Sequence, residues 1–548
     1  PASIMVRDFD ASASPHLLAA LKAFFGVVSG ELPEEEVDVM AAGLMEAGFK
    51  ARAIVTIAQV VATLLCDLED GDVAAAMRQM VSSTSSATKL LAQLKAHPTD
   101  DDADLTCRLH LAVVGEIGRV VNVESSGSLN DLNTLTSNVW GGSFMPRIKK
   151  AASTAYGQLA GGSPGGVITF LSAQMRTSGA AIQWVLEALR SALRHANSGA
   201  LCEHAPGLLD RVVATLDEPR VCAERDSRAL ISDCIGSMCA VSLAADSMPI
   251  ITKIKSVYDR TETPLVKATI IDSVRIYIGE HLDENYQLPR DGPLGPVLAA
   301  FVGEMESEMD PSNLNNLDVI TASLKLAGAT VRRSPMLLKK LLAGRREILD
   351  AAVMHMAYRT DLIREVQLGP MKQKIDDALP IRKLSFNFLD ACCVELMGVV
   401  AASNIVVDIC GVGAHPTKGG TFTGICSALR WGPKDDPIVA VKAIALLGRL
   451  CLSAGSQVKT QLDMVMLTLQ RYLWLPGAGK NAFEAKKKLY IAQGWVTFAT
   501  STMAVLSRIE NVDTNRKYSD ALAHLKSTDS VGYAELSEAY NKAMMALE

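Results

Sequence analysis

The stretch LIREVQLGPMKQKIDDALPIRKLSF, residues 362–386, decides the organisation of the chain because it joins two kinds of structure. Its first part alternates apolar and polar residues around a Gly369–Pro370 pair, which predicts a tight β-hairpin over 362–377. Its second part opens with proline and continues as an apolar helix. An isolated hairpin is marginal in water, so it must lean on the adjacent helices or be ordered by a partner. On the pattern alone, a kinked loop that contacts nothing stays an alternative.

The helical pattern of the second part recurs along the whole chain. Each copy has a turn with Pro, Asp or Asn, then a basic residue that we expect to be solvated, then an alanine-rich apolar helix. A helix such as Ile182–Leu193 occupies the corresponding position between two copies. The copies are Asp104–Gly118, Pro146–Ala160 and those that begin near Asp226, Pro264, Leu317, Pro380 and Pro437. Their spacing of roughly 35–60 residues is near the repeat of HEAT or armadillo units.

A single helical unit of this kind cannot bury its apolar face, whereas stacked units share one continuous core. We therefore predict an all-α fold, a HEAT/armadillo-type α-solenoid superhelix of about ten or eleven repeats over 1–548, with one protruding β-hairpin. The glycine-rich segments Gly161–Gly166 and Pro416–Gly424 are expected to be loops between helices. The polar segment 513–548 is expected to be a C-terminal cap.

The composition excludes several classes of function. A net charge of −6 over 548 residues argues against a nucleic-acid binder. The most apolar run, Ile54–Cys66, is too short to span a bilayer and is predicted to be a buried helix, so we expect no membrane partner. Eleven cysteines without CxxC spacing indicate small buried hydrophobes and a reducing compartment. The chain starts without Met or a signal peptide, so we expect a piece of a longer protein.

No candidate active site emerges from the motifs. Gly411 and Gly413 are followed by His415–Pro416 and not by a helix, which argues against a dinucleotide loop, and Gly479–Lys480 lacks the other residues of a phosphate loop. The histidines, among them His110 and His355, have no metal-ligand spacing. Paired acids such as Asp376–Asp377 and Asp435–Asp436 precede helices and are interpreted as N-caps. We expect no cofactor, no metal and no catalysis.

The stretch around the predicted hairpin resembles the C-terminal region of one family, the cullin-associated, neddylation-dissociated proteins (TIP120 family). The matching positions are Glu365, Val366, Gly369, Pro370, Met371, Lys372, Asp376, Asp377, Ile381, Arg382 and Lys383. Weaker similarity follows in the same order over 14–30, 109–123, 148–160 and 222–236. Ala378 stands where the family commonly has Gly, and 411–424 looks like an insertion.

The resemblance implies a function. Family members are HEAT solenoids that wrap around a cullin lacking its ubiquitin-like modifier, together with its RING subunit, and they exclude the substrate adaptor. This chain resembles the C-terminal half, whose hairpin occupies the place where the adaptor docks. The resemblance therefore implies a non-catalytic substrate-receptor exchange factor of cullin–RING ubiquitin ligases, cytoplasmic and nuclear.

The residues expected to contact the partner lie on the hairpin. Val366, Leu368, Met371 and Ile375 are expected to make apolar contacts, and Lys372 and Lys374 to pair with an acidic adaptor surface. Glu365, Gly369 and Pro370 complete the predicted site. The alternative is a generic HEAT-repeat scaffold or a karyopherin-like transport protein, which would share the repeats but not the hairpin.

Overall fold

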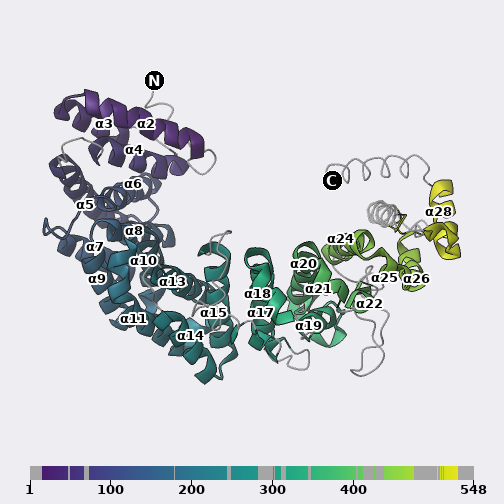
Figure 1. Ribbon diagram of the computed structural model, residues 1–548. Coiled ribbons are helices and arrows are strands. Elements are labelled where there is room, and N and C mark those ends of the chain that lie inside the picture. The colour runs from purple at the N-terminus through teal and green to yellow at the C-terminus, as the bar shows by residue number, and fades with distance from the viewer. Residues whose placement is uncertain are drawn as a thin grey trace. The chain divides into compact units, whose positions relative to one another are not determined.

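Helices account for most of the described residues in the computed structural model (Figure 1). The chain divides into two units, residues 1–257 and 258–548, and each is described by itself. The structure describes residues 15–46, 50–66, 73–177, 179–243, 248–281, 300–301, 303–305, 307–309, 316–342, 347–402, 405–410, 424–425, 437–473, 503, 506–507, 509 and 511–528.

The first unit is a succession of helices joined by short turns. Its helices are α2 Pro15–Glu31, α3 Glu34–Glu46, α4 Ile54–Cys66, α5 Val73–Ala96, α6 Asp101–Gly118, α7 Leu129–Gly141, α8 Pro146–Gln158, α9 Pro164–Thr177, α10 Ile182–His195, α11 Ser198–Ala214, α12 Pro219–Ala223, α13 Arg225–Leu243 and α14 Met248–Arg260, the last of which spans the unit boundary. Short 3₁₀ turns occupy Ala51–Ala53, Leu159–Gly161, Gly179–Ala181 and Thr215–Asp217.

Helices that are not consecutive in sequence pack side by side in this unit. α2, α4, α6, α8, α10 and α13 form one row in which each helix contacts the next, and α9 and α11 contact each other outside it. α5 lies between α4 and α6 in sequence and contacts both of them. Two stacked rows of helices are the architecture of a helical solenoid, in which each structural repeat covers the apolar face of the next repeat.

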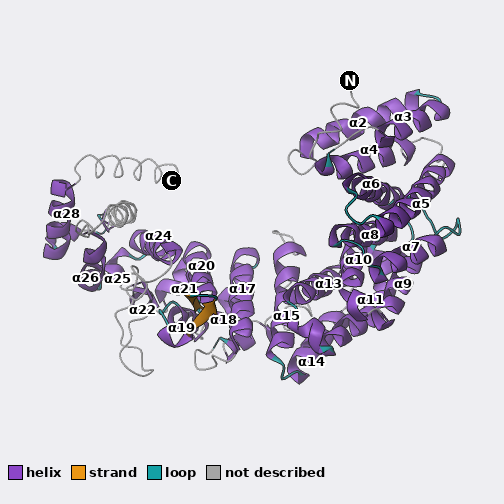
Figure 2. Cartoon of the chain, turned by 180° about the vertical axis from the view of Figure 1, so that it is seen from behind, coloured by secondary structure: helices purple, strands orange, loops and turns teal. Residues whose placement is uncertain are grey.

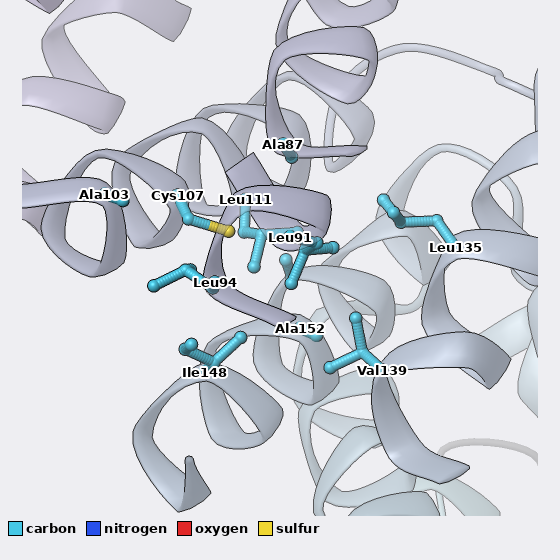
Figure 3. Packing of buried hydrophobic residues seen from close by; sticks show 11 residues of the cluster. Ala87, Leu91, Leu94, Ala103, Cys107, Leu111, Leu135, Val139, Ile148 and Ala152 are labelled. Carbon is cyan, nitrogen blue, oxygen red and sulfur yellow. The ribbon is translucent and has the colours of Figure 1, made fainter. Parts of the chain in front are cut away.

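The backbones of the central row approach each other closely at glycines. A Cβ atom on Gly115 of α6 would lie 2.7 Å from the Cα of Ala155 in α8, and one on Gly157 of α8 would lie 2.3 Å from the carbonyl oxygen of Ala188 in α10. A cluster of buried residues lies among α5–α8, with members at helical spacings such as Ala103, Cys107 and Leu111 (Figure 3). The residues of this cluster are Ala87, Leu91, Leu94, Ala103, Cys107, Leu111, Leu135, Val139, Ile148, Ala152 and Ala155.

The second unit repeats the arrangement and adds a two-stranded sheet, drawn in orange in Figure 2. α15, α17, α20 and α24 form its central row. Its elements are α15 Pro264–Ile276 followed by a π turn Tyr277–His281, α17 Leu317–Arg333, α18 Pro335–Leu342, α19 Glu347–His355, a 3₁₀ turn Thr360–Leu362, β1 Ile363–Leu368, β2 Met371–Asp376, α20 Leu379–Glu395, α21 Met397–Ala402, α22 Ile405–Cys410, α24 Pro437–Ser453, α25 Gly455–Lys459, α26 Leu462–Leu473, a 3₁₀ turn Val512–Thr514 and α28 Arg516–Thr528.

The predicted fold class is confirmed: an α-solenoid with one β-hairpin. Each recurring sequence copy is a helix, and the apolar run Ile54–Cys66 is the largely buried helix α4. None of the helices within the described ranges is both long and apolar enough to cross a membrane. The segments 411–423 and 529–548 lie outside the described residues, and the C-terminal cap stays a prediction.

One expected loop is mostly helical. In the segment 161–166, Gly161 ends a 3₁₀ turn and α9 already begins at Pro164. The glycines are needed for close contacts, since a Cβ atom on Gly162 would lie 2.1 Å from the carbonyl oxygen of Val121. Glycine in this segment therefore marks tight packing between helices, where the sequence pattern indicated a loose connection.

Candidate partner-binding hairpin

The hairpin closes through a two-residue turn. β1 and β2 pair antiparallel with Leu368 opposite Met371, so that Gly369 and Pro370 alone connect them. Gly369 has a φ of +59°, a conformation that glycine adopts without steric cost. The ring of the next residue, Pro370, restricts its φ to about −65°. Positive φ followed by negative φ is the type II′ pattern, whose twist matches that of paired strands.

The register separates the side chains onto two faces of different chemistry. Cross-strand partners share a face and successive residues alternate between faces. One face carries Glu365 opposite Lys374 and Gln367 opposite Lys372. The other carries Val366, Leu368, Met371 and Ile375 together with Arg364 and Gln373. The hairpin is therefore amphipathic, with the four predicted apolar residues on one face and both predicted lysines on the other.

The charged face is solvated. The Nζ of Lys374 lies 3.6 Å and that of Lys372 3.9 Å from the Glu365 carboxylate, and the three side chains are between 51% and 73% exposed. Ion pairs this exposed contribute between zero and about 1 kcal/mol to stability. Glu365 partly offsets the two lysines, so the face presents a modest positive charge to solvent.

The apolar face is incompletely covered by the protein. Met371, next to the turn, is 71% exposed. Val366 and Ile375 are half-buried, and Gly369 and Pro370 are exposed. The backbone of Leu368 lies directly opposite that of Met371 in the strand pairing. Full burial of a Met or Val side chain stabilises a fold or a complex by about 1.5–3 kcal/mol. Folding of this chain gains only part of that free energy at the hairpin, and a partner that covers the apolar face would gain the rest.

The base of the hairpin is fixed by a buried arginine. Arg382 of α20 is fully buried, and its Nη2 donates to the Asp376 carboxylate at 2.7 Å. The guanidinium also lies over the Tyr358 ring, 5.1 Å from the centroid. The same carboxylate accepts from the backbone N–H of Ala378. A carboxylate held between a strand end and a helix start orients the hairpin relative to α20.

A second pair lies outside this buried one. Arg364 of β1 donates to Asp377 at 2.7 Å, and the N–H of Asp377 donates to the carbonyl of Leu362. Arg364 is 59% and Asp377 32% exposed. Both acids therefore act at the base of the hairpin: Asp376, 19% exposed, pairs with a buried arginine, and Asp377, 32% exposed, pairs with an exposed one.

Two expectations about this segment are wrong. Asp376 and Asp377 do not cap α20, whose N-cap is Ala378 and has no side-chain cap bond. The basic residue after Pro380 is not solvated, because Arg382 points at Asp376 and is fully buried. Asp376 pairs with Arg382 and Asp377 pairs with Arg364. Sequence reasoning missed one signal: an Asp stands six residues before an Arg, and the helix starts between them at Leu379–Pro380.

Other chemically distinctive residues are structural where they are described. Cys392 and Cys393 are buried, and burial raises the pKa of both thiols, that of Cys393 to about 12, so they stay protonated. His355 is buried with Nε2 2.7 Å from the carbonyl oxygen of Met309, and burial lowers the pKa of His110. Across the described residues, no group of His, Cys, Asp or Glu could hold a metal ion. The glycine segments at 411–413 and 475–483 and the acids Asp435–Asp436 lie outside those residues.

One family model matches the segment that contains the hairpin. Residues 341–482 match the TIP120 family, described as TATA-binding protein interacting (TIP20). The "Cullin-associated NEDD8-dissociated protein 2" of Mus musculus is 26% identical over 319 residues, which cover 57% of this chain and 23% of that protein. The "Cullin-associated NEDD8-dissociated protein 1" of Arabidopsis thaliana is 23% identical over 484 residues, which cover 87% of this chain and 34% of that protein.

Further similarity comes from Emericella nidulans and from solved structures. The Emericella "Cullin-associated NEDD8-dissociated protein 1, C-terminal part" is 25% identical over 281 residues, 51% of this chain and 24% of that protein. A structure of importin beta aligns over 99% of this chain and 64% of its own with 11% identity and a TM-score of 0.40, which is too low to bear on function. The chain spans between a fifth and about a third of the length of the curated relatives it matches.

By fold and site, the chain is a helical-repeat protein with one anchored, amphipathic hairpin. By sequence, its residues 341–482 match the TIP120 family model, and more than half of its length is similar to cullin-associated NEDD8-dissociated proteins.

Proposed function

We propose that this chain is a non-catalytic regulator of cullin–RING ubiquitin ligases. In this proposal it binds a cullin that lacks its ubiquitin-like modifier, together with the RING subunit, and competes with the substrate adaptor. The observation that carries the proposal is the hairpin: an exposed, amphipathic and rigidly based element inside the segment 341–482 that matches TIP120. The names of the relatives support association with a cullin.

The geometry suits a competitive mechanism. The hairpin presents Met371 and its apolar neighbours for burial in a pocket, and Lys372 and Lys374 on the opposite face for an acidic rim. Apolar anchors mainly lower the dissociation rate of a complex, whereas rim charges mainly raise the association rate. The anchored base limits the conformational entropy that binding would cost. The hairpin can therefore occupy a site with little reorganisation.

Exchange requires more than occupancy. If chain and adaptor bind one cullin transiently together, each must weaken the other, and such coupling is reciprocal. A coupling free energy of about 1–3 kcal/mol, the usual scale, weakens adaptor binding by roughly 5- to 150-fold, and most such changes in affinity lie in the dissociation rate. The hairpin is the part of this chain that we assign to the clash with the adaptor, and the helical rows supply the remaining contact area.

The decisive experiment follows release of a labelled adaptor from a purified, unmodified cullin–RING complex after addition of the full chain. In the test variant, a Gly-Ser loop of equal length replaces residues 368–374. We expect cullin binding to persist and adaptor release to fall to its spontaneous rate. A matched control is Val120→Ser, which removes another exposed apolar side chain, 59% exposed, from the turn that follows α6. Val120→Ser should release the adaptor like the unaltered chain.

Two results would contradict the proposal. Unaltered release by the loop variant would remove the hairpin from the mechanism. Failure of the unaltered chain to bind the cullin complex, with or without its modifier, would reject the function itself. The alternative of a transport or scaffold protein would then be tested by recovering a small GTPase or a phosphatase subunit with the purified chain.

A further inference from the structure

A second candidate binding surface lies in the second unit, between three helices of its central row, one of which, α20, also anchors the hairpin through Arg382. A cavity of about 370 Å³ opens at the surface between α15, α17 and α20. Its size is at the lower end of the range for ligand pockets, about 300–1,000 Å³. It has room for one or two side chains. No residue of the hairpin lines it.

The cavity exists because the middle of α17 has small residues. Gly328 and Ala329 line it, and a Cβ atom on Gly328 would meet only the Nη2 of Arg332, at 3.1 Å, within 4 Å. The hollow beside these small residues is bounded by α15 and α20, which contribute Arg275 and Leu384 to its lining. Its floor is apolar, with Leu324 1% exposed and Phe388 fully buried.

The walls of the cavity are cationic. Among the eleven described residues that line it, four are Lys or Arg and none is acidic: Arg275, Lys325, Arg332 and Arg333. Asp272 compensates Arg275 in part, since its carboxylate lies 2.8 Å from the Arg275 Nε. The Nε of Arg332 donates to the carbonyl of Gly328 at 2.9 Å, which holds that guanidinium over the cavity. At the rim, Lys442 of α24 donates to Asn387 and adds another cation nearby.

We propose that this cavity binds an acidic protein segment in which an apolar side chain stands beside its carboxylates. The apolar side chain enters above Gly328 and contacts Leu324 and Phe388, while the carboxylates pair with Lys325, Arg332 and Arg333. Guanidinium groups bind carboxylates with strong, charge-assisted hydrogen bonds. The inference goes beyond the proposed function, because it holds whatever protein contacts the hairpin.

The floor of the cavity distinguishes this ligand from a polyphosphate. A polyphosphate would use the cations but would gain nothing from an apolar floor, and desolvating it there costs free energy. An acidic segment with an apolar anchor uses both features of the cavity. The two ligands are therefore separable by changing the floor and the walls independently.

The test uses fluorescence anisotropy with the full chain and a labelled synthetic peptide that has a central Leu flanked by Asp and Glu residues. Lys325→Glu/Arg332→Glu should weaken binding by tenfold or more, about 1.4 kcal/mol or more. The control Lys459→Glu/Arg516→Glu makes the same change of net charge at exposed residues outside the cavity and should leave binding within about twofold.

A second variant fills the cavity and keeps its charges. Gly328→Leu replaces a helical glycine whose only close neighbour is the flexible end of Arg332, so α17 should fold at least as well as before. It should weaken the Leu peptide about tenfold, and a peptide with Ser in place of Leu should bind the unaltered chain equally weakly. The Ser peptide should bind the Gly328→Leu variant almost as well as it binds the unaltered chain, because the two changes remove the same contact.

Three outcomes would overturn the inference: no saturable binding of the Leu peptide, equal binding by the wall and control variants, or binding that Gly328→Leu leaves unchanged. Inositol hexakisphosphate is the competing probe. If it binds more tightly than the Leu peptide and is insensitive to Gly328→Leu, the cavity is a polyphosphate site and the proposed acidic segment is rejected.

Discussion

The cluster around Leu111 in the first unit and the hairpin in the second use apolar side chains in opposite ways. In the cluster, the apolar side chains lie inside and contact one another across four helices (Figure 3). In the hairpin, the apolar Met371 is 71% exposed. At the base of the hairpin, the charged side chain of Arg382 is fully buried. The fold therefore depends on apolar contacts in the first region and on a buried ion pair in the second.

The contrast shows which residues are retained for stability and which are available for binding. An exposed Met next to a turn contributes almost nothing to folding, yet its burial by a partner would contribute on the order of 2 kcal/mol. A buried arginine at a strand end does not fill a core, but it fixes one conformation of the hairpin. Substitutions in the two regions should consequently separate stability from binding.

The largest effect is expected in the cluster. Leu111→Ala removes a side chain that is 3% exposed in α6 and leaves a cavity, which should lower the free energy of unfolding by about 2–5 kcal/mol. Repeat proteins do not unfold as one cooperative unit, so the effect should be read locally. Hydrogen exchange of α5–α8 should accelerate while exchange of the hairpin does not change.

Leu111→Met is the matched control, because it nearly conserves volume and should cost less than about 1.5 kcal/mol. Equal exchange in the Ala and Met variants would show that this cluster does not hold its helices together.

A smaller, local loss is expected at the hairpin base. Asp376→Ala leaves the guanidinium of Arg382 buried without its carboxylate, which should cost about 3 kcal/mol, the lower end of the range because Asp376 is 19% exposed. Amide exchange over 363–376 should accelerate. Asp376→Ala/Arg382→Met should restore much of the protection, since no buried charge remains.

The neighbouring pair provides the comparison. Asp377→Ala breaks the Arg364–Asp377 pair, in which Arg364 is 59% exposed, and should cost no more than about 1 kcal/mol. Similar exchange in the Asp376 and Asp377 variants would contradict the assignment of Arg382 as the anchor.

The next effect tests the close approach of helix backbones. Gly157→Ala places a Cβ atom 2.3 Å from the carbonyl of Ala188 and should destabilise the contact of α8 with α10 by about 1–3 kcal/mol. In α3, a Cβ atom on Gly43 would meet nothing within 4 Å, so Gly43→Ala should stabilise by up to about 1 kcal/mol. Opposite shifts of the thermal midpoint are expected, and shifts of the same sign would refute close packing at Gly157.

The elements of the fold were predictable because their signals are local. Proline at a helix start and apolar residues every three or four positions mark α8, α15 and α24, and the alternation around Gly369–Pro370 marks both strands with the correct turn. These patterns depend on neighbours within one helical turn or one strand pair, which the sequence contains directly.

The base of the hairpin was not predictable in the same way. An Asp before a helix has two common roles, N-cap and ion-pair partner, and the choice here depends on where Arg382 points in three dimensions. Gly162 lies in a segment that the sequence pattern marks as a loop, but its close neighbour is the backbone carbonyl of Val121, far away along the chain. The cavity at Gly328 also arises from three helices together, so no local pattern marks it.

The smallest effect on stability, and the one that separates the two regions most clearly, is expected at the tip. Met371→Ser alters a side chain that is 71% exposed, so the free energy of unfolding should change by less than about 0.5 kcal/mol. Exchange over 363–376 should stay as in the unaltered chain, because the Arg382–Asp376 pair is intact. Adaptor release should nevertheless slow, since an apolar anchor for the partner is lost. If Met371→Ser destabilised the hairpin as strongly as Asp376→Ala, the tip would be part of the fold, and its exposed apolar face would no longer indicate a partner.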